Sequence, residues 1–327
     1  MPSSRTLMWW LVGLLFTLAI GLRHRVGGDW WAYLLYLERA APLSLVEVLS
    51  STDPGYILVN WLVAQFDGPI YWVNLICGAI LMMGVMSFSR RQPLPWLALL
   101  VAVPYLIIVV GMGYTRQAVA LGFLLISLTA LSRSKMGWFV FWVMLGATFH
   151  KSAVLILPVA ALASTSNRLW NFAWVGLMFV VGSYLFLFDS AEHLWINYVQ
   201  ADYQSEGGLI RVLMNAVPAV LFFLLHRRLR LSEAERKLWL WMAMLALVCI
   251  PLVVVSSAAT DRVALYLIPL QIFVFSRLPL VSAKPRFRGA IALAVVGYYA
   301  LVQSVWLFFA THSFAWLPYQ NVLWLGD

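Results

Sequence analysis

Basic side chains recur at the points where apolar segments of this chain begin. They are Arg116, His150 with Lys151, Arg211 and Arg262. The first turn of a helix already exposes N–H groups with partial positive charge, so a cation there needs a negative partner. No acidic residue lies near Arg116 in the sequence, and phosphate is the ligand that satisfies both arginines and helix starts. The pattern therefore predicts a shared anion site, above all for a phosphate.

Each of these positions also has a structural interpretation. A single cation at a membrane boundary can extend to the lipid headgroups, which suits Lys151 in particular. Arg211 follows a polar loop and can simply pair with Glu206. A histidine at a helix start is often a hydrogen-bonded structural residue, and neighbouring cations and a phosphate would favour a chemical role for His150.

Acidic residues are gathered in the same loops as these cations. Asp29 follows a Gly-Gly pair and precedes three aromatic residues, which is typical of a carboxylate held over a platform on which sugar rings stack. Asp29 fits equally well as the N-cap of the helix that follows. Glu47 and Asp53 share one loop, and Asp53 is better explained as a turn or cap residue. Asp261 can simply orient its neighbour Arg262.

The composition is that of a polytopic membrane protein. Of the 327 residues, 63% are hydrophobic and only 11% are charged, whereas soluble domains have about 25% charged residues. The net charge of +9 is spread over short loops between apolar segments, which indicates membrane orientation and not binding of nucleic acid. Zinc-ligand spacing, an Asp-x-Asp pair, a phosphate-binding loop with lysine and a serine elbow do not occur, so we expect no metal and no cofactor.

Apolar segments divide the whole chain into one integral membrane domain over residues 1–327. We expect an all-α fold of about eleven transmembrane helices, since roughly 17–25 residues cross a bilayer. A shorter apolar segment near 55–66 is too short to cross and is expected to be re-entrant or interfacial. The expected crossing segments are 6–22, 69–89, 94–112, 116–132, 136–150, 152–165, 169–188, 209–226, 238–256, 262–277 and 289–310.

The charges of the loops predict how the chain is oriented in the membrane. With the N-terminus in the cytoplasm, most of the 22 Lys and Arg fall on the cytoplasmic side, and most of the 13 Asp and Glu fall on the other side. This orientation places the C-terminus outside the cytoplasm. It also places the basic residues of the predicted anion site on that same outer face.

Short islands in the hydrophobic sequence follow one another in a defined order. They are Gly28-Asp29-Trp30 with Tyr33, then Pro54-Gly55-Tyr56, Tyr114-Thr115-Arg116-Gln117, Phe149-His150-Lys151-Ser152 with Pro158, Asp261-Arg262 with Tyr266, and Pro318-Tyr319. Together they resemble the EpsG-like branch of the Wzy-type polysaccharide polymerases. The family's usual Gly-Thr-Asp-Tyr is here Gly-Gly-Asp-Trp, and its usual Glu-Pro-Gly-Tyr is here Asp-Pro-Gly-Tyr.

The resemblance implies a glycosyltransferase of the bacterial inner membrane, with a GT-C-like helical fold similar to that of O-antigen ligases. Such enzymes take an undecaprenyl-diphosphate-linked oligosaccharide as donor and a second lipid-linked unit as acceptor, on the periplasmic face and without a metal. Membrane lipids and a chain-length regulator protein are the further partners it implies.

The chemistry of breaking a glycosyl diphosphate assigns roles to the candidate residues. We expect Arg116 and Arg262 to hold the diphosphate with Lys151 and Arg211. His150 either hydrogen-bonds to the diphosphate or accepts the proton of the acceptor hydroxyl, and Asp29 is the competing base. Arg23 and Arg25 are expected to guide the second substrate, and the remaining expected substrate contacts are Glu47, Tyr33, Tyr114, Tyr266 and Tyr319.

Other functions fit the same pattern less well. An O-antigen ligase uses the same donor with a lipid A-core acceptor, but ligases usually carry a larger outer domain. A flippase or transporter of lipid-linked sugars should carry charges in the middle of its membrane spans. A structural subunit that binds lipid through its basic clusters is the remaining alternative.

Overall fold

The computed structural model describes residues 4–133, 135–163, 168–187, 205 and 207–324. Within these ranges the chain is helical, and the single β-bridge, between Arg23 and Asn321, belongs to no strand. The expected all-α membrane fold is confirmed. The principal helices are α1 (Ser4–Gly21), α2 (Trp30–Ala40), α3 (Leu45–Leu49), α4 (Pro54–Ala64), α5 (Ile70–Ser89), α6 (Pro95–Ala102), η1 (Val103–Val110), α7 (Gly111–Gly113), α8 (Thr115–Leu131), α9 (Met136–Ala147), η2 (Lys151–Ile156), α10 (Leu157–Ala163), α11 (Arg168–Leu187), α13 (Gly208–Leu225), α14 (Glu233–Val255), α15 (Ser257–Leu265), α16 (Ile268–Phe275) and α17 (Pro285–Phe309). Shorter turns are η5 (Leu278–Val281), η6 (Ser313–Ala315) and η7 (Val322–Trp324).

The expected crossing segments coincide with helices, although several of these are short. Six helices of the described residues are long and apolar enough to span a bilayer, and α15 with α16, bent by 45°, makes a seventh if the pair counts as one span. The helices α8 and α9 and the pair η2–α10 are apolar but contain fewer than 18 residues, as does the apolar part of α1, Thr6–Gly21. The chain is therefore a multi-pass membrane protein, and the number of about eleven crossings stays a prediction.

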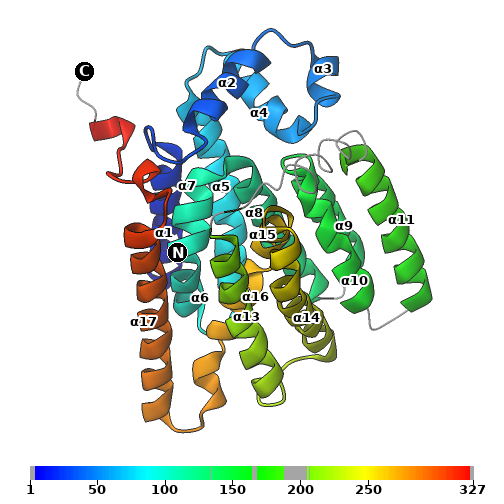
Figure 1. The fold of residues 1–327 in the computed structure, drawn as a ribbon, viewed down its shortest axis with the longest axis vertical. Helices are drawn as coiled ribbons and strands as arrows, with labels where there is room; N and C mark the ends of the chain where they lie inside the picture. Colours follow the sequence, from blue (N-terminus) through cyan, green and yellow to red (C-terminus); the bar gives the residue numbers. More distant parts are fainter. Residues whose placement is uncertain (1–3, 134, 164–167, 188–204, 206, 325–327) are drawn as a thin grey trace.

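The short helix α4 lies with α2 and α3 at one end of the bundle, the end that also holds the C-terminus (Figure 1). It has 11 residues, begins with Pro54 and packs chiefly against α2. A helix this short cannot cross a bilayer, which agrees with the interfacial or re-entrant placement predicted for it. The helix α4 packs against both α2 and α3, and α2 and α4 contact α5.

A sharp corner between α7 and α8 places Arg116 in the first turn of a membrane helix. The segment before it is a π-helix, η1, which contains Pro104 near its start, and proline lacks the N–H that a regular helix needs. The indole N–H of Trp316 donates to the carbonyl of Ile108, 3.1 Å away, within that π-helix. Gly113 is required at the corner, because a Cβ there would overlap the Trp316 ring.

The helix α8 is held close to α5 by glycines. A Cβ on Gly84 would overlap the backbone of Gly122, so the two helices approach backbone to backbone. These two helices form one of the most extensive contacts in the molecule, and most of α8 is buried. The start of α8, which carries Arg116, is consequently fixed against the loops that precede α2 and α4.

Candidate active site

The guanidinium of Arg116 is held between a carboxylate and an aromatic ring. Its Nη1 lies 2.6 Å from Asp53 Oδ2, and its centre lies 4.9 Å from the ring centroid of Tyr36 on α2. The prediction that the chain supplies no anion for Arg116 was therefore wrong. Asp53 occupies the N-cap position of α4 but makes no side-chain cap bond, so its expected role as a cap is also corrected.

His150 lies in the break between α9 and η2, where two hydroxyl groups meet one of its ring nitrogens. Its Nδ1 is 2.6 Å from Ser152 Oγ and 3.3 Å from the hydroxyl of Tyr266. Ser152 Oγ and the Tyr266 hydroxyl are themselves 3.2 Å apart. Tyr266, which we expected to contact substrate, is only 2% exposed and instead supports His150.

The charges of the predicted cations converge on His150. Burial, and after it the positive charges of Arg116, Arg262 and Lys151, together lower the pKa of His150 from 6.5 to about 3. Three basic residues from α8, α15 and η2 therefore act on one imidazole. The imidazole is neutral at physiological pH, and the region around it is strongly positive and suited to an anion.

Asp29 lies in front of α2 with its side chain open to solvent. It stands at the N-cap position but makes no cap hydrogen bond, and the described residues offer it no ion pair within contact distance. Neighbouring protein atoms nevertheless remove part of the water around the carboxyl and raise its pKa, while the charges of Arg116 and Arg262 act in the opposite direction. Of the two roles predicted for Asp29, the cap is not realised, and the carboxylate is available to a substrate.

Arg211 belongs to a second cluster beside this site. It pairs with Asp261, donates to the Tyr105 hydroxyl at 3.0 Å, and shares Ser205 Oγ with Asp261. The expected pairing of Arg211 with Glu206 falls on a residue outside the described part of the chain. The expectation that Asp261 only orients Arg262 was incomplete, because its carboxylate holds Arg211 and thereby ties α15 to α13.

Several expected substrate contacts have structural roles. Arg23 is fully buried and donates to Ile20 O, Val26 O, Asn74 Oδ1 and Thr115 Oγ1, so it joins the end of α1 to α5 and α8 and cannot guide a substrate. Glu47 closes a capping box with Ser44 on α3. The Tyr319 hydroxyl donates to Ala19 O at 2.9 Å.

The other expected contacts lie nearer the site. Tyr33 is buried on α2, with its ring 5.7 Å from that of Tyr56. Tyr114 is the half-buried residue at the corner before α8. Arg25 is exposed, and its guanidinium lies 5.6 Å from the ring centroid of Trp31, so this pair still offers a surface for a second substrate.

Sequence reasoning missed three residues of the site. Asp53 was interpreted as a turn, Ser152 was only part of a motif, and Tyr36 was not considered. Tyr36 is three residues from Tyr33 and therefore on the same side of a helix, which is the signal that could have found it. Within the described residues, no three His, Cys, Asp or Glu side chains come together in a way that could hold a metal ion.

Comparison with known proteins identifies one family. The model of the EpsG family matches residues 6–321, almost the whole chain. The same comparisons matched no curated protein and no solved structure.

Proposed function

Because the chain belongs to the EpsG family, whose members are relatives of the Wzy-type polysaccharide polymerases, we propose that it joins lipid-linked oligosaccharides into a polysaccharide. The donor is an oligosaccharide on undecaprenyl diphosphate, the acceptor is a second lipid-linked unit, and the reaction takes place on the periplasmic face of a bacterial inner membrane. The N-terminus is then cytoplasmic and the C-terminus periplasmic.

The observation that supports this proposal best is the convergence of Arg116, Arg262 and Lys151 on His150. When a glycosyl diphosphate bond breaks, negative charge develops on the departing diphosphate. Fixed cations and helix starts aimed at that charge stabilise the transition state, because they need no reorganisation during the reaction. A single neutral sugar would gain little from so many positive charges.

Arg116 keeps donors for a diphosphate although it already contacts Asp53. Only its Nη1 engages that carboxylate, and its Nε has no hydrogen-bond partner among the described residues. A guanidinium has five N–H donors, so one bond to Asp53 leaves several for phosphate oxygens. The side chain is 29% exposed, which gives a ligand access to it. Asp53 therefore orients Arg116 without using up its binding capacity.

The reaction is a displacement at the anomeric carbon of the donor. The acceptor hydroxyl oxygen forms the new bond, the bond from the anomeric carbon to the phosphate oxygen breaks, and its electron pair stays on the diphosphate. The proton of the acceptor hydroxyl passes to a base of the site, for which His150 and Asp29 are the two candidates. Holding both lipid-anchored substrates at one face supplies the proximity that the step needs.

The experiment that tests this function uses the full-length protein in detergent with a defined undecaprenyl-diphosphate-linked oligosaccharide. A ladder of longer lipid-linked products, resolved by gel and mass spectrometry, is the expected result. A flippase gives no longer product without a membrane. A ligase leaves the donor unextended until lipid A-core is added, so either outcome rejects the polymerase proposal.

A further inference from the structure

Three polar groups at His150 form a closed triangle. His150 Nδ1, Ser152 Oγ and the Tyr266 hydroxyl are separated by 2.6, 3.2 and 3.3 Å. Ser152 and Tyr266 are 9% and 2% exposed, and neither side chain has another hydrogen-bond partner among the described residues. The protons of this triangle must therefore find their acceptors inside it.

Counting protons decides which nitrogen of His150 carries the hydrogen. If Nδ1 is protonated, the three groups hold three hydrogens, and one buried hydroxyl hydrogen is left without an acceptor. If Nδ1 is unprotonated, both hydroxyl hydrogens have acceptors. The first hydroxyl donates to the second, and the second hydroxyl donates to Nδ1. A buried donor without an acceptor is unfavourable, so the arrangement with an unprotonated Nδ1 is favoured.

We propose that Ser152 and Tyr266 hold His150 as the tautomer with its proton on Nε2, so that His150 donates a hydrogen bond to the diphosphate and Asp29 accepts the proton of the acceptor hydroxyl. This inference rests on the proposed function. In this tautomer Nε2 has no lone pair to receive a proton, and Nδ1 is occupied by the two hydroxyls. Asp29 is the carboxylate that faces solvent beside the same arginines and has neither a cap bond nor an ion pair in the described structure.

The two roles divide the reaction between opposite sides of the transferred sugar. His150 Nε2–H and the arginines bind the phosphate oxygens, where the electron pair of the broken bond arrives. Asp29 receives the hydrogen of the acceptor hydroxyl as its oxygen bonds to the anomeric carbon. Ser152 and Tyr266 are positioning residues, since they act on the substrate only through His150.

The tautomer can be measured directly on the intact protein. In protein labelled with ¹⁵N-histidine, long-range ¹H–¹⁵N spectra distinguish protonated from unprotonated ring nitrogens, and His150→Gln identifies the signals of His150 among the five histidines. We expect an unprotonated Nδ1 in the wild type and a mixture of tautomers in the double variant Ser152→Ala/Tyr266→Phe. Ser127→Ala, which removes another buried serine hydroxyl, on α8, is the matched control and should leave the spectrum unchanged. A protonated Nδ1 in the wild type overturns the proposal.

Activity separates a donor from a base at position 150. Glutamine can place an N–H donor near the position of Nε2 but cannot accept a proton, so His150→Gln should keep polymerase activity within about tenfold of wild type. Asp29→Asn should lose on the order of 10²–10⁴-fold, the usual contribution of a general base. Equal and complete loss in His150→Gln and His150→Ala, with activity retained in Asp29→Asn, contradicts the division of roles. If the wild type makes no polymer, the proposed function fails, and the spectra still test the tautomer.

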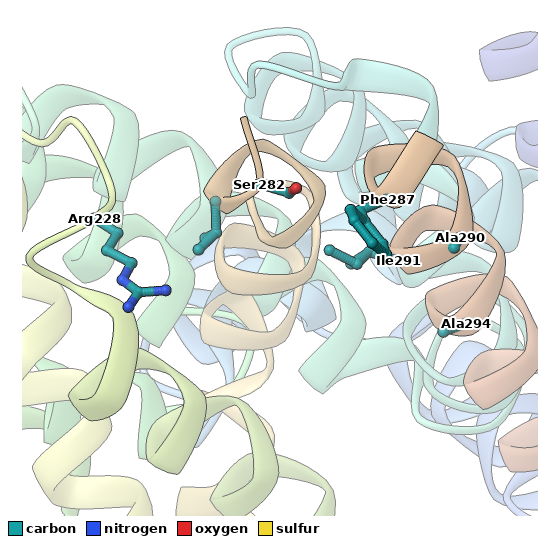
Figure 2. A pocket seen from close by; sticks show the side chains of 7 residues that line it. Arg228, Ser282, Phe287, Ala290, Ile291 and Ala294 are labelled. Atoms are coloured by element: carbon teal, nitrogen blue, oxygen red, sulfur yellow. The ribbon is translucent and has the colours of Figure 1, made fainter. Parts of the chain in front are cut away.

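A second inference concerns the opposite end of the bundle. A cavity of about 520 Å³ opens there between the turn after α13, the end of η5 and the first half of α17. Figure 2 shows Arg228 on one side and Phe287 and Ile291 on the other, with Ser282 between them. The α17 side is apolar at i, i+3, i+4 and i+7 spacing from Phe287 to Ala294, so one helix face lines the cavity.

The chemistry of this cavity matches an anionic phospholipid, and we propose that it binds one. The guanidinium of Arg228 is exposed and has no hydrogen bond or ion pair within the described residues. No acidic residue lines the cavity, and Arg228 is the one charged residue among those that line it. A headgroup phosphate fits Arg228 and the Ser282 hydroxyl, and an acyl chain fits along the apolar face of α17.

Lipid titration of the purified protein tests this site. Phosphatidylglycerol should raise the melting temperature of the wild type and of Arg227→Gln, which removes a neighbouring exposed arginine outside the cavity. Arg228→Gln should bind about fivefold more weakly, since a basic residue near a headgroup contributes about 1 kcal/mol. Ala294→Trp, which fills the apolar end, should also weaken binding. Equal responses of Arg227→Gln and Arg228→Gln, or the same stabilisation by inorganic phosphate, overturn the proposal.

Discussion

Arg116 and Asp53 form an ion pair at 2.6 Å although 63 residues separate them in the chain. The pair joins the start of α8 to the start of α4 and fixes the arginine at the end of the bundle where α2 and α4 lie. The two side chains are 29% and 10% exposed, so the carboxylate is the more deeply buried partner. Removing the arginine alone therefore leaves the Asp53 carboxylate poorly solvated and lowers the stability of the protein. This loss of stability must be separated from any effect on catalysis.

A double variant separates these effects. Arg116→Ala should abolish polymer formation and also lower the melting temperature, because it strands the Asp53 carboxylate. Arg116→Ala/Asp53→Ala should recover most of the melting temperature without recovering activity, with a loss on the order of 10²–10³-fold or more for the missing phosphate donor. Polymer of normal length from the double variant would show that Arg116 does not bind the diphosphate.

The pair between Arg211 and Asp261 should act mainly on stability. Both side chains are nearly buried, at 13% and 11% exposure, and breaking such a pair from one side costs about 3–5 kcal/mol. Arg211→Met should therefore lower the thermal stability strongly, and Arg211→Met/Asp261→Leu should restore part of it. Thermal unfolding in detergent, followed by tryptophan fluorescence, is the measurement. A normal melting temperature in Arg211→Met would assign this cluster to substrate binding alone.

His150 should make the stability of the protein depend on pH. Its pKa is about 3 when folded and about 6.5 when unfolded, so between these values the unfolded chain binds a proton that the folded chain excludes. Stability then rises with pH in this window, is fully present above pH 6.5 and is lost as the pH falls toward 3. We expect His150→Gln to reduce the difference in melting temperature between pH 5 and pH 7.5. An unchanged difference would place His150 in contact with water.

The pH dependence of catalysis should follow Asp29. Its pKa is raised above the ordinary 3.8, and a base must be ionised to accept a proton. The value of kcat/KM should therefore fall as the pH decreases through the raised pKa of Asp29. His150 stays neutral, so its protonation should not contribute to the acid side of the pH–rate profile. Measurements of kcat/KM against pH on wild type and His150→Gln test this expectation. A decrease in kcat/KM near pH 6.5 that is present in the wild type and absent in the variant would assign the proton transfer to His150.

The corner before α8 can be tested by a pair of opposite volume changes. Gly113→Ala should destabilise the protein and reduce activity, because its new Cβ overlaps the Trp316 ring. Gly113→Ala/Trp316→Ala should recover part of the stability by removing the overlap, although the indole bond to Ile108 O is lost. Melting temperature and polymer length measure the two effects separately, and an undisturbed Gly113→Ala variant would contradict the tight packing.

The local pattern correctly predicted that Arg116, Lys151 and Arg211 lie in the first turns of helices. The same prediction was wrong for Arg262, which lies in the last turn of α15, before the bend into α16. Partners could not be predicted in the same way. Arg211 was expected to bind the diphosphate, with a pair to nearby Glu206 as the alternative, yet in the structure it pairs with Asp261, 50 residues away. Tyr266 supports His150 across 116 residues, and Arg23 is buried where a loop arginine was expected to be exposed. These pairings depend on how the helices pack, and no alternation of apolar and polar residues encodes that packing.

Residues 315–322 complete the loop that follows the first helix. Gly27 N–H donates to Ala315 O, His24 N–H to Gln320 O, and Val322 N–H to Leu22 O. The loop that leads to Asp29 is thus held in place by a segment that is far away in the sequence. We therefore expect chains truncated before residue 315 to lose the placement of Asp29 and, with it, polymer formation.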